Sequence, residues 1–137
     1  MTDYLVDNSV WARLGSGDVR ITARLRRIER APADLFVTCP PQVLEFCHSA
    51  RNPEEHARYR DQISLGFPLE RAPDESLVLD IQTALWSAGL VRAAGSLDIL
   101  IAGYAIVNDA TVLAADHDFD HIAAVTDLQH EYVAPTQ

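Results

Sequence analysis

The chain has 137 residues, of which 48% are hydrophobic and 23% are charged. This composition predicts one domain over residues 1–137 with a packed core, and it excludes a disordered chain, a collagen-like repeat and a coiled coil. The 11 basic residues are all arginines and stand against 20 acidic residues, which gives a formal net charge of −9. A broad basic surface for unspecific binding to duplex nucleic acid is therefore not expected, although a local arginine patch is compatible with these counts.

Membrane and secretory signals are not found in the sequence. No segment has the ~20 continuous apolar residues of a membrane-spanning helix, and the N-terminus lacks the basic and apolar regions of a secretory signal. Cys39 and Cys47 are the only cysteines, and their spacing fits neither a disulfide framework nor a paired zinc-binding motif. We therefore expect a cytoplasmic protein with reduced thiols and no membrane contact, in which Cys47 packs as a small apolar residue.

The first half of the chain alternates apolar runs with segments of helical periodicity. Residues 3–7 predict a short strand, and Asp7-Asn8-Ser9 predicts the start of a helix with Asn8 or Ser9 as its N-cap. Further helices are expected at residues 19–31, 40–49 and 53–64, and further strands at residues 35–39 and 67–69.

The second half repeats this alternation. Residues 73–75 predict the beginning of a helix that stops at Gly89, and residues 96–108 predict a central helix that is apolar on nearly every side. A buried strand at 111–115, a short helix at 119–125 and a last strand at 131–133 complete the pattern. Strands separated by helices predict an α/β fold with a mainly parallel central sheet, covered by helices on both faces.

Two carboxylates lie inside apolar helical segments, Glu45 in Val-Leu-Glu-Phe-Cys and Asp98 in Leu-Asp-Ile-Leu-Ile. Burial of an unpaired carboxylate costs several kcal/mol, so each requires a cation, a hydrogen-bond donor or access to solvent. Since the chain has no lysine and the nearest arginines are Arg51 and Arg92, a metal ion is an attractive partner. Asp98 also fits the first turn of a helix capped by Ser96, and Glu45 also fits a helix edge that faces water.

Two further acids, Asp7 and Asp116, follow predicted buried strands. In an open parallel sheet, ligands bind outside the carboxyl ends of the strands, and the neighbouring helices can bring Glu45 and Asp98 to the same edge. Each strand-end acid also has an ordinary interpretation, as part of an Asp-Asn-Ser turn or of a solvated acidic turn. The convergence of four acids at one edge favours a joint role.

These residues resemble the PIN domain, and most closely the VapC-type toxins of bacterial toxin–antitoxin modules. The resemblance covers the whole chain and rests on Asp7-Asn8-Ser9, the single Glu45, and two longer motifs, Ser-Leu-Asp-Ile-Leu-Ile-Ala at 96–102 and Val-Leu-Ala-Ala-Asp-His-Asp-Phe-Asp-His-Ile-Ala at 112–123. It implies that four acids are catalytic and bind the metal, namely Asp7, Glu45, Asp98 and Asp116. It further implies that Asp118 is a supporting acid, that Ser9 orients Asp7 or a phosphate, and that Arg92 contacts RNA or braces the acids.

An oxygen-only ligand set suits Mg²⁺, or Mn²⁺, rather than zinc. Such ions hold a scissile phosphate and lower the pKa of an attacking water, which predicts hydrolysis of a phosphodiester bond. The family resemblance selects RNA as the substrate and an endonucleolytic cut, and it implies a VapB-type antitoxin as partner and a homodimer.

Other readings of the same residues remain open at this point. A catalytically silent PIN-fold interaction domain would keep the scaffold without the reaction. Asp116, Asp118 and Asp120 also occupy the first positions of an EF-hand-like calcium loop, although His121 replaces the required glycine. The five arginines between Arg20 and Arg30 are expected on the solvated or partner-facing side of an amphipathic helix, with contact to backbone phosphate as the alternative.

Overall fold

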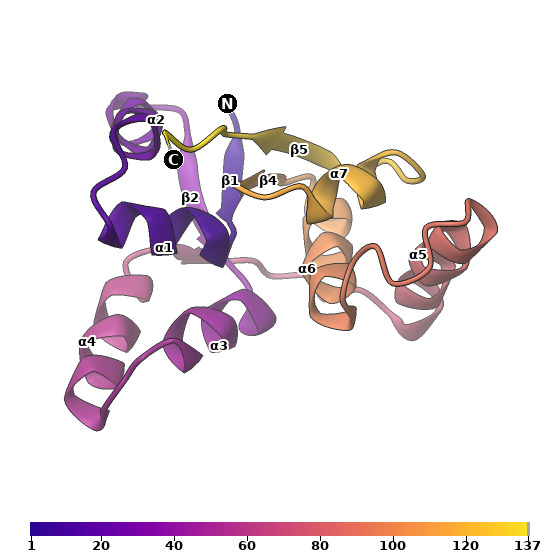
Figure 1. Cartoon of the computed structure of the whole chain (residues 1–137), viewed down its shortest axis with the longest axis horizontal. Coiled ribbons are helices and arrows are strands. Elements are labelled where there is room, and N and C mark those ends of the chain that lie inside the picture. Colours follow the sequence, from indigo (N-terminus) through magenta and orange to yellow (C-terminus); the bar gives the residue numbers. More distant parts are fainter. Residues whose placement is uncertain (137) are drawn as a thin grey trace.

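A five-stranded parallel sheet forms the centre of the computed structural model, which describes residues 1–136. The strands are β1 (Asp3–Val6), β2 (Leu35–Thr38), β3 (Phe67–Pro68), β4 (Thr111–Ala114) and β5 (Gln129–Tyr132). Their order in the sheet is β3-β2-β1-β4-β5, and each neighbouring pair is parallel (Figure 1). The expected parallel α/β sheet is confirmed, and β1 lies at its middle.

The helices connect these strands and agree with the expected segments to within a few residues. They are α1 (Asn8–Gly15), α2 (Val19–Arg30), α3 (Pro40–His48), α4 (Pro53–Ile63), α5 (Glu75–Ser87), α6 (Ser96–Val107) and α7 (Asp118–Ala123). Within residues 1–136, no helix is long and apolar enough to span a bilayer.

Two predicted helix caps are wrong by one or two residues. The N-cap of α1 is Asp7, whose carboxylate accepts a hydrogen bond from the Ser9 amide at 3.1 Å, and neither Asn8 nor Ser9 takes this position. The N-cap of α6 is Gly95, which has no side chain for capping, so Ser96 is the first helical residue. Asp7 therefore caps its own helix while it also lies at the edge of the sheet.

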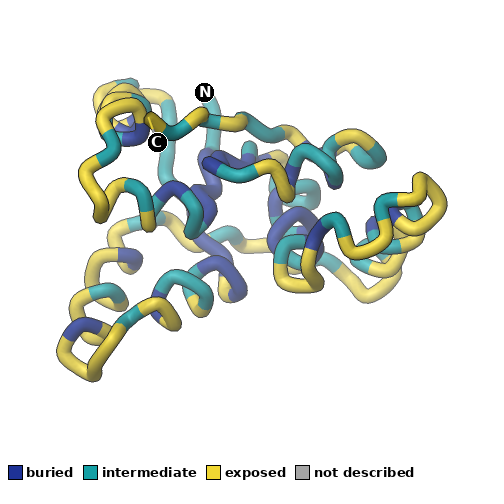
Figure 2. Tube along the Cα trace, in the orientation of Figure 1, coloured by how far each residue is buried: buried dark blue, intermediate teal, exposed yellow. Residues whose placement is uncertain are grey.

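Helices cover both faces of the sheet, as alternation along the strands dictates. On one face, Tyr4 and Val6 of β1 pack with apolar side chains of α1 and α2. On the other face, Leu5 packs against α5, α6 and α7, and this second core includes Cys39 but not Cys47. Cys47 is itself buried, as expected, and Figure 2 shows that burial is concentrated along β1, β4 and the start of α6.

The two edges of the sheet are closed in different ways. At one edge, β3 consists of two residues and ends on Pro68, which has no backbone N–H. At the other edge, Arg24 of α2 donates to both carboxylate oxygens of Glu131 on β5, at 2.6 and 2.9 Å, and to the Tyr4 hydroxyl at 2.9 Å. Arg24 is thus a structural member of the arginine series, whereas Arg20, Arg26, Arg27 and Arg30 are exposed.

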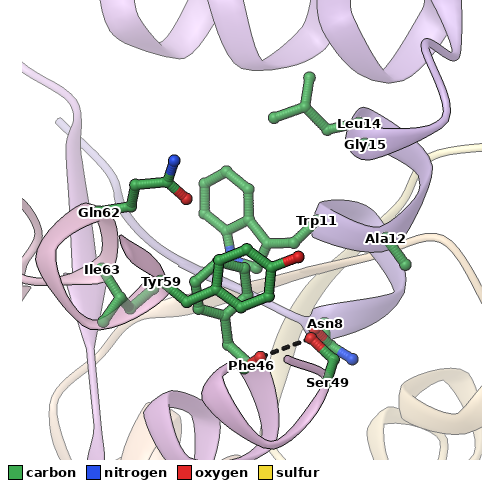
Figure 3. A pocket seen from close by; sticks show the side chains of 10 residues that line it. All are labelled: Asn8, Trp11, Ala12, Leu14, Gly15, Phe46, Ser49, Tyr59, Gln62 and Ile63. Carbon is green, nitrogen blue, oxygen red and sulfur yellow. Dashed lines mark hydrogen bonds between the residues drawn. The ribbon is translucent and has the colours of Figure 1, made fainter. Parts of the chain in front are cut away.

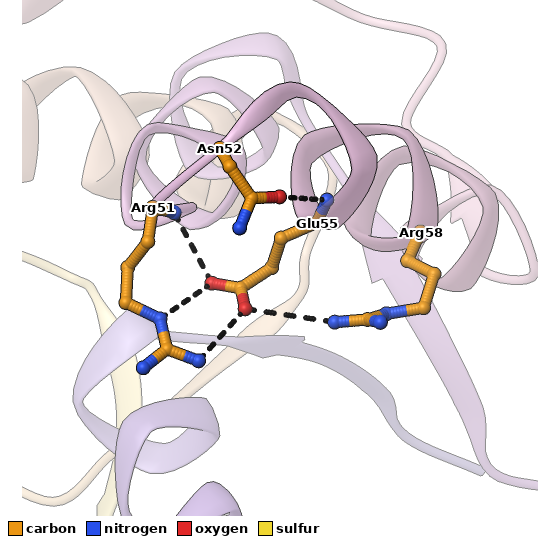
Figure 4. Close-up of polar contacts among 4 residues, drawn as sticks. All are labelled: Arg51, Asn52, Glu55 and Arg58. Carbon is orange, nitrogen blue, oxygen red and sulfur yellow. Dashed lines mark hydrogen bonds and ion pairs between the residues drawn. The ribbon is translucent and has the colours of Figure 1, made fainter.

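A polar network fixes the beginning of α4 against the end of α3 (Figure 4). Asn52 caps α4 by accepting from the Glu55 amide at 2.8 Å, and Glu55 in turn accepts from the backbone and side chain of Arg51. Arg58 approaches the same carboxylate at 3.5 Å. The hydrogen bonds from Arg51 lower the pKa of Glu55 to about 2, so this carboxylate stays ionised and holds the helix start in place.

The turn between α4 and β3 tests how closely the sheet is packed. A Cβ atom at Gly66 would lie 2.7 Å from Cγ2 of the buried Thr38 side chain, whereas one at Gly15 would meet nothing within 4 Å. Gly66→Ala is expected to reduce the free energy of unfolding by about 1–3 kcal/mol, because an added methyl group overpacks the site. Gly15→Ala is the matched control and leaves stability equal or slightly higher in denaturant titrations. Equal stabilities of the two variants would contradict this account of the packing.

Candidate active site

The carboxyl ends of the two central strands place Asp7 and Asp116 at the same edge of the sheet. Val6 of β1 pairs with Leu113 of β4, and the Asp7 amide donates to the Leu113 carbonyl at 2.8 Å, which extends the ladder by one residue. Asp7 is only 5% exposed. Asp116 follows β4 two residues beyond its end and is partly exposed.

Two helices bring the other predicted acids to this edge. Glu45 lies on α3 and Asp98 on α6, and the two helices contact each other. Burial raises the pKa of Glu45, and the charges of Asp7, Asp116 and Asp118 raise it further. The structure therefore unites the acids that sequence reasoning selected, from four separate parts of the chain.

Asp98 is the most perturbed of these acids for which a magnitude is given. Burial raises its pKa to about 7, and the charges of Asp7, Asp118 and Glu45 act in the same direction. The pKa of Asp118 is also raised, by burial first and then by the Asp116 charge, while a hydrogen bond with Asp98 opposes the shift. Asp118 thus belongs to the group although it is exposed and lies in the first turn of α7.

Ser9 and Gln42 position the strand ends that carry the acids. The Ser9 hydroxyl accepts a hydrogen bond from the Ala115 amide at 2.9 Å, which ties α1 to the residue before Asp116. The amide of the buried Gln42 side chain donates to the Val6 carbonyl at 2.6 Å, immediately before Asp7. Gln42 was not among the predicted site residues, and its one signal was a polar residue in the otherwise apolar first turn after Pro40-Pro41.

The chemistry of the acids fits a hard divalent cation. Oδ1 of Asp7 is buried and has no hydrogen-bond partner, and in residues 1–136 no arginine or histidine forms an ion pair within 4 Å of any acid of the group. Oxygen donors with an excess of negative charge are the ligand type that Mg²⁺ prefers. As the side chains stand in the described part of the chain, no three His, Cys, Asp or Glu residues are close enough to share one metal ion.

Asp120 is separate from this group because two histidines bind it. Nδ1 of His117 and Nε2 of His130 each lie 2.7 Å from one of its carboxylate oxygens, and these contacts lower its pKa. Both Asp118 and Asp120 are part of α7. The EF-hand-like calcium loop is therefore excluded, because its ligands must come from an irregular loop.

Arg92 lies outside the group of acids. It is exposed, its φ of 61° is in the left-handed region, and it forms no ion pair within 4 Å in residues 1–136. A contact between Arg92 and RNA therefore stays a prediction.

Sequence reasoning missed a cavity beside the acids. This aromatic pocket of about 520 Å³ lies between α1, α3 and α4 (Figure 3). Its lining residues are Asn8, Trp11, Ala12, Leu14, Gly15, Phe46, Ser49, Tyr59, Gln62 and Ile63. The three aromatic residues come from three helices, so no local periodicity announces them.

Comparison with known proteins agrees with this architecture and these residues. The family model described as PIN domain matches residues 4–125, and the chain therefore belongs to the PIN-domain family. Within it the chain is a member of the VapC ribonuclease toxins, as full-length relatives show. It is 35% identical to Ribonuclease VapC2 of Mycobacterium tuberculosis, with 96% of this chain and 94% of the relative covered, and 33% identical to Ribonuclease VapC21, with the same coverage.

Solved structures of low sequence identity share the fold. VapBC2 from Rickettsia felis, bound to a DNA fragment from its promoter, matches with a TM-score of 0.75 at 16% identity, covering 97% of this chain and 100% of that one. VapBC-1 from nontypeable Haemophilus influenzae matches with a TM-score of 0.72 at 20% identity, covering 96% and 98%.

The raised pKa values predict an inverse dependence of stability on pH. Because folding raises the pKa of Asp98 from 3.8 to about 7, the folded state binds its proton more tightly than the unfolded state. In chelator, the melting temperature is therefore expected to rise as the pH falls from 8 through 7 toward 5. Asp98→Asn should reduce this rise, whereas Asp80→Asn, at an exposed position of α5, should keep it. A melting temperature that falls over this range would contradict the prediction.

Proposed function

We propose that the chain is a Mg²⁺-dependent endoribonuclease, in which Asp7, Glu45, Asp98 and Asp116 are catalytic and hold the metal, with Asp118 in support. The observation that carries the proposal is the mutual repulsion among these acids at the strand ends, with no arginine or histidine paired to them in residues 1–136. Retention of such an arrangement in a folded protein is costly unless a cation binds there. Mn²⁺ satisfies the same ligand set.

The chemistry follows from the position of these groups. A bound Mg²⁺ supplies a Lewis acid that polarises the scissile phosphate and lowers the pKa of an attacking water. Asp7 presents its unpartnered Oδ1 from a dry position, while Asp116 and Asp118 lie at the solvent side, where RNA enters. Ser9 holds Asp7 and the end of β4 in register, and Arg92 is proposed to contact the RNA backbone from outside the group.

We further propose that the protein acts in the cytoplasm as the toxin of a toxin–antitoxin pair, with a VapB-type antitoxin as partner and as a homodimer. The structural neighbours are described as VapBC and FitAB complexes. The net charge of −9 suits a basic antitoxin segment that covers the acids. A silent interaction domain is disfavoured because all five acids are retained.

RNA cleavage tests this proposal directly. Purified protein, free of antitoxin, is expected to cut total RNA into discrete fragments with Mg²⁺ and not with chelator. Asp98→Asn should lower the cleavage rate by at least about a hundredfold, because metal ions contribute several kcal/mol to such reactions. Asp80→Asn serves as the carboxylate control on α5. Intact RNA with wild-type protein and Mg²⁺ would refute the nuclease proposal.

Thermal melts separate a metal ligand from a structural acid at Glu45. Glu45→Gln removes one of the repelling charges, so in chelator it is expected to melt at the same or a higher temperature than the parent. Mg²⁺ should then stabilise the parent by about 2.7 kcal/mol at a hundredfold excess over Kd, and the variant much less. A variant that is less stable in chelator, yet keeps the full Mg²⁺ shift, would remove Glu45 from the metal site.

A further inference from the structure

The aromatic pocket offers three ring faces within one cavity. Phe46 lies between the other two rings, with its centroid 6.1 Å from that of Trp11 and 4.9 Å from that of Tyr59. All three residues are partly exposed, so their faces are accessible from solvent. A volume of about 520 Å³ lies within the range of ~300–1,000 Å³ that is usual for pockets that bind small molecules.

The pocket shares two helices with the candidate active site. On α1, Asn8 lines the pocket and directly follows Asp7, and on α3, Phe46 lines the pocket and directly follows Glu45. Consecutive Cα atoms are about 3.8 Å apart, so the two sites are adjacent along both helices. A nucleic acid whose phosphate lies at the acids therefore has a neighbouring base within reach of the rings.

The polar groups of the pocket suit the edge of a nucleobase. Asn8 and Gln62 present side-chain amides, each with both a donor and an acceptor, and neither is hydrogen-bonded to another of the lining residues drawn in Figure 3. The Ser49 hydroxyl is engaged, since it donates to the Phe46 carbonyl at 2.6 Å. Unpaired bases in RNA are bound in this way, by stacking on aromatic side chains and by hydrogen bonds along the base edge.

The α4 side of the pocket is rigid, which stacking requires. Tyr59 lies one turn after Glu55, the residue that Arg51, Asn52 and Arg58 fix at the helix start. The ring is therefore held by the α3–α4 connection and does not depend on the contents of the pocket.

We infer that the aromatic pocket binds an unpaired base of the RNA, next to the phosphate that the acids hold, and thereby sets which sites are cut. The inference rests on the proposed nuclease function. Stacking on Trp11, Phe46 and Tyr59 supplies the affinity, and the amides of Asn8 and Gln62 distinguish one base from another. An apolar side chain of the antitoxin is the competing occupant.

Two variants of Tyr59 separate stacking from simple filling of the cavity. Tyr59→Leu keeps an apolar side chain without a ring, and Tyr59→Phe keeps the ring without the hydroxyl. On a pool of single-stranded RNA of random sequence, Tyr59→Leu is expected to raise KM by about 5- to 150-fold and to flatten the base preference beside the cut. Tyr59→Phe should retain both properties, and Trp86→Phe on α5 is the aromatic control.

Binding is measured independently of cleavage through the fluorescence of Trp11. The chain has two tryptophans, so Trp86→Phe leaves Trp11 as the only reporter. With this variant in chelator, short oligoadenylate or oligouridylate is expected to quench Trp11 saturably, and an abasic oligomer of equal length is not. Adding Tyr59→Leu should shift the quenching curve to higher oligonucleotide concentration by a similar factor.

The outcomes are distinguishable. A wild-type protein that does not cut RNA refutes the nuclease proposal, whereas cutting with a KM and a base preference that Tyr59→Leu does not change refutes the base pocket alone. Equal quenching by abasic and normal oligomers also refutes it. If Tyr59→Leu weakens only inhibition by the cognate antitoxin, the pocket belongs to the antitoxin and the inference is wrong.

Discussion

Repulsion between carboxylates at the carboxyl edge of the sheet is the interaction around which this structure is organised. Asp7, Glu45, Asp98 and Asp118 each have a raised pKa, because burial removes water from them and because each adds its charge to the others. Left alone, such a group would separate or take up protons. The fold opposes separation with the two most buried strands, β1 and β4, and with α6, whose apolar surface is buried on the same side.

The small polar contacts near the acids gain their importance from this repulsion. The bond from Ala115 to Ser9 and the bond from Gln42 to Val6 each join a strand end to a helix start, one residue away from an acid. Buried hydrogen bonds of this kind contribute little net stability but are expensive to leave unmade, so they fix positions strictly. The result is a rigid frame in which charge, and not shape, is the adjustable quantity.

Much of the fold could be predicted from the sequence, because apolar runs and helical periodicity are local signals. The same is true of Glu45 and Asp98, which are conspicuous as acids within apolar segments. Cap positions at Asp7 and Gly95 could not be read, since several adjacent residues compete for the same geometry. The aromatic pocket was also hidden, because Trp11, Phe46 and Tyr59 meet only after three helices have packed, and Tyr59 comes from a segment that reads as charged and solvated.

The closed edges of the sheet have a consequence for how this protein behaves at high concentration. A strand edge with free N–H and C=O groups is a template for a further strand, which is a common route to aggregation. Here one edge ends in a two-residue strand with Pro68, and the other is fastened by Arg24 to Glu131 and carries charge along its length. Neither edge offers a ladder to an incoming chain, so self-association and complex formation proceed through helices and side chains. A protein built in this way can assemble with partners while it resists the open-ended stacking of its own sheet.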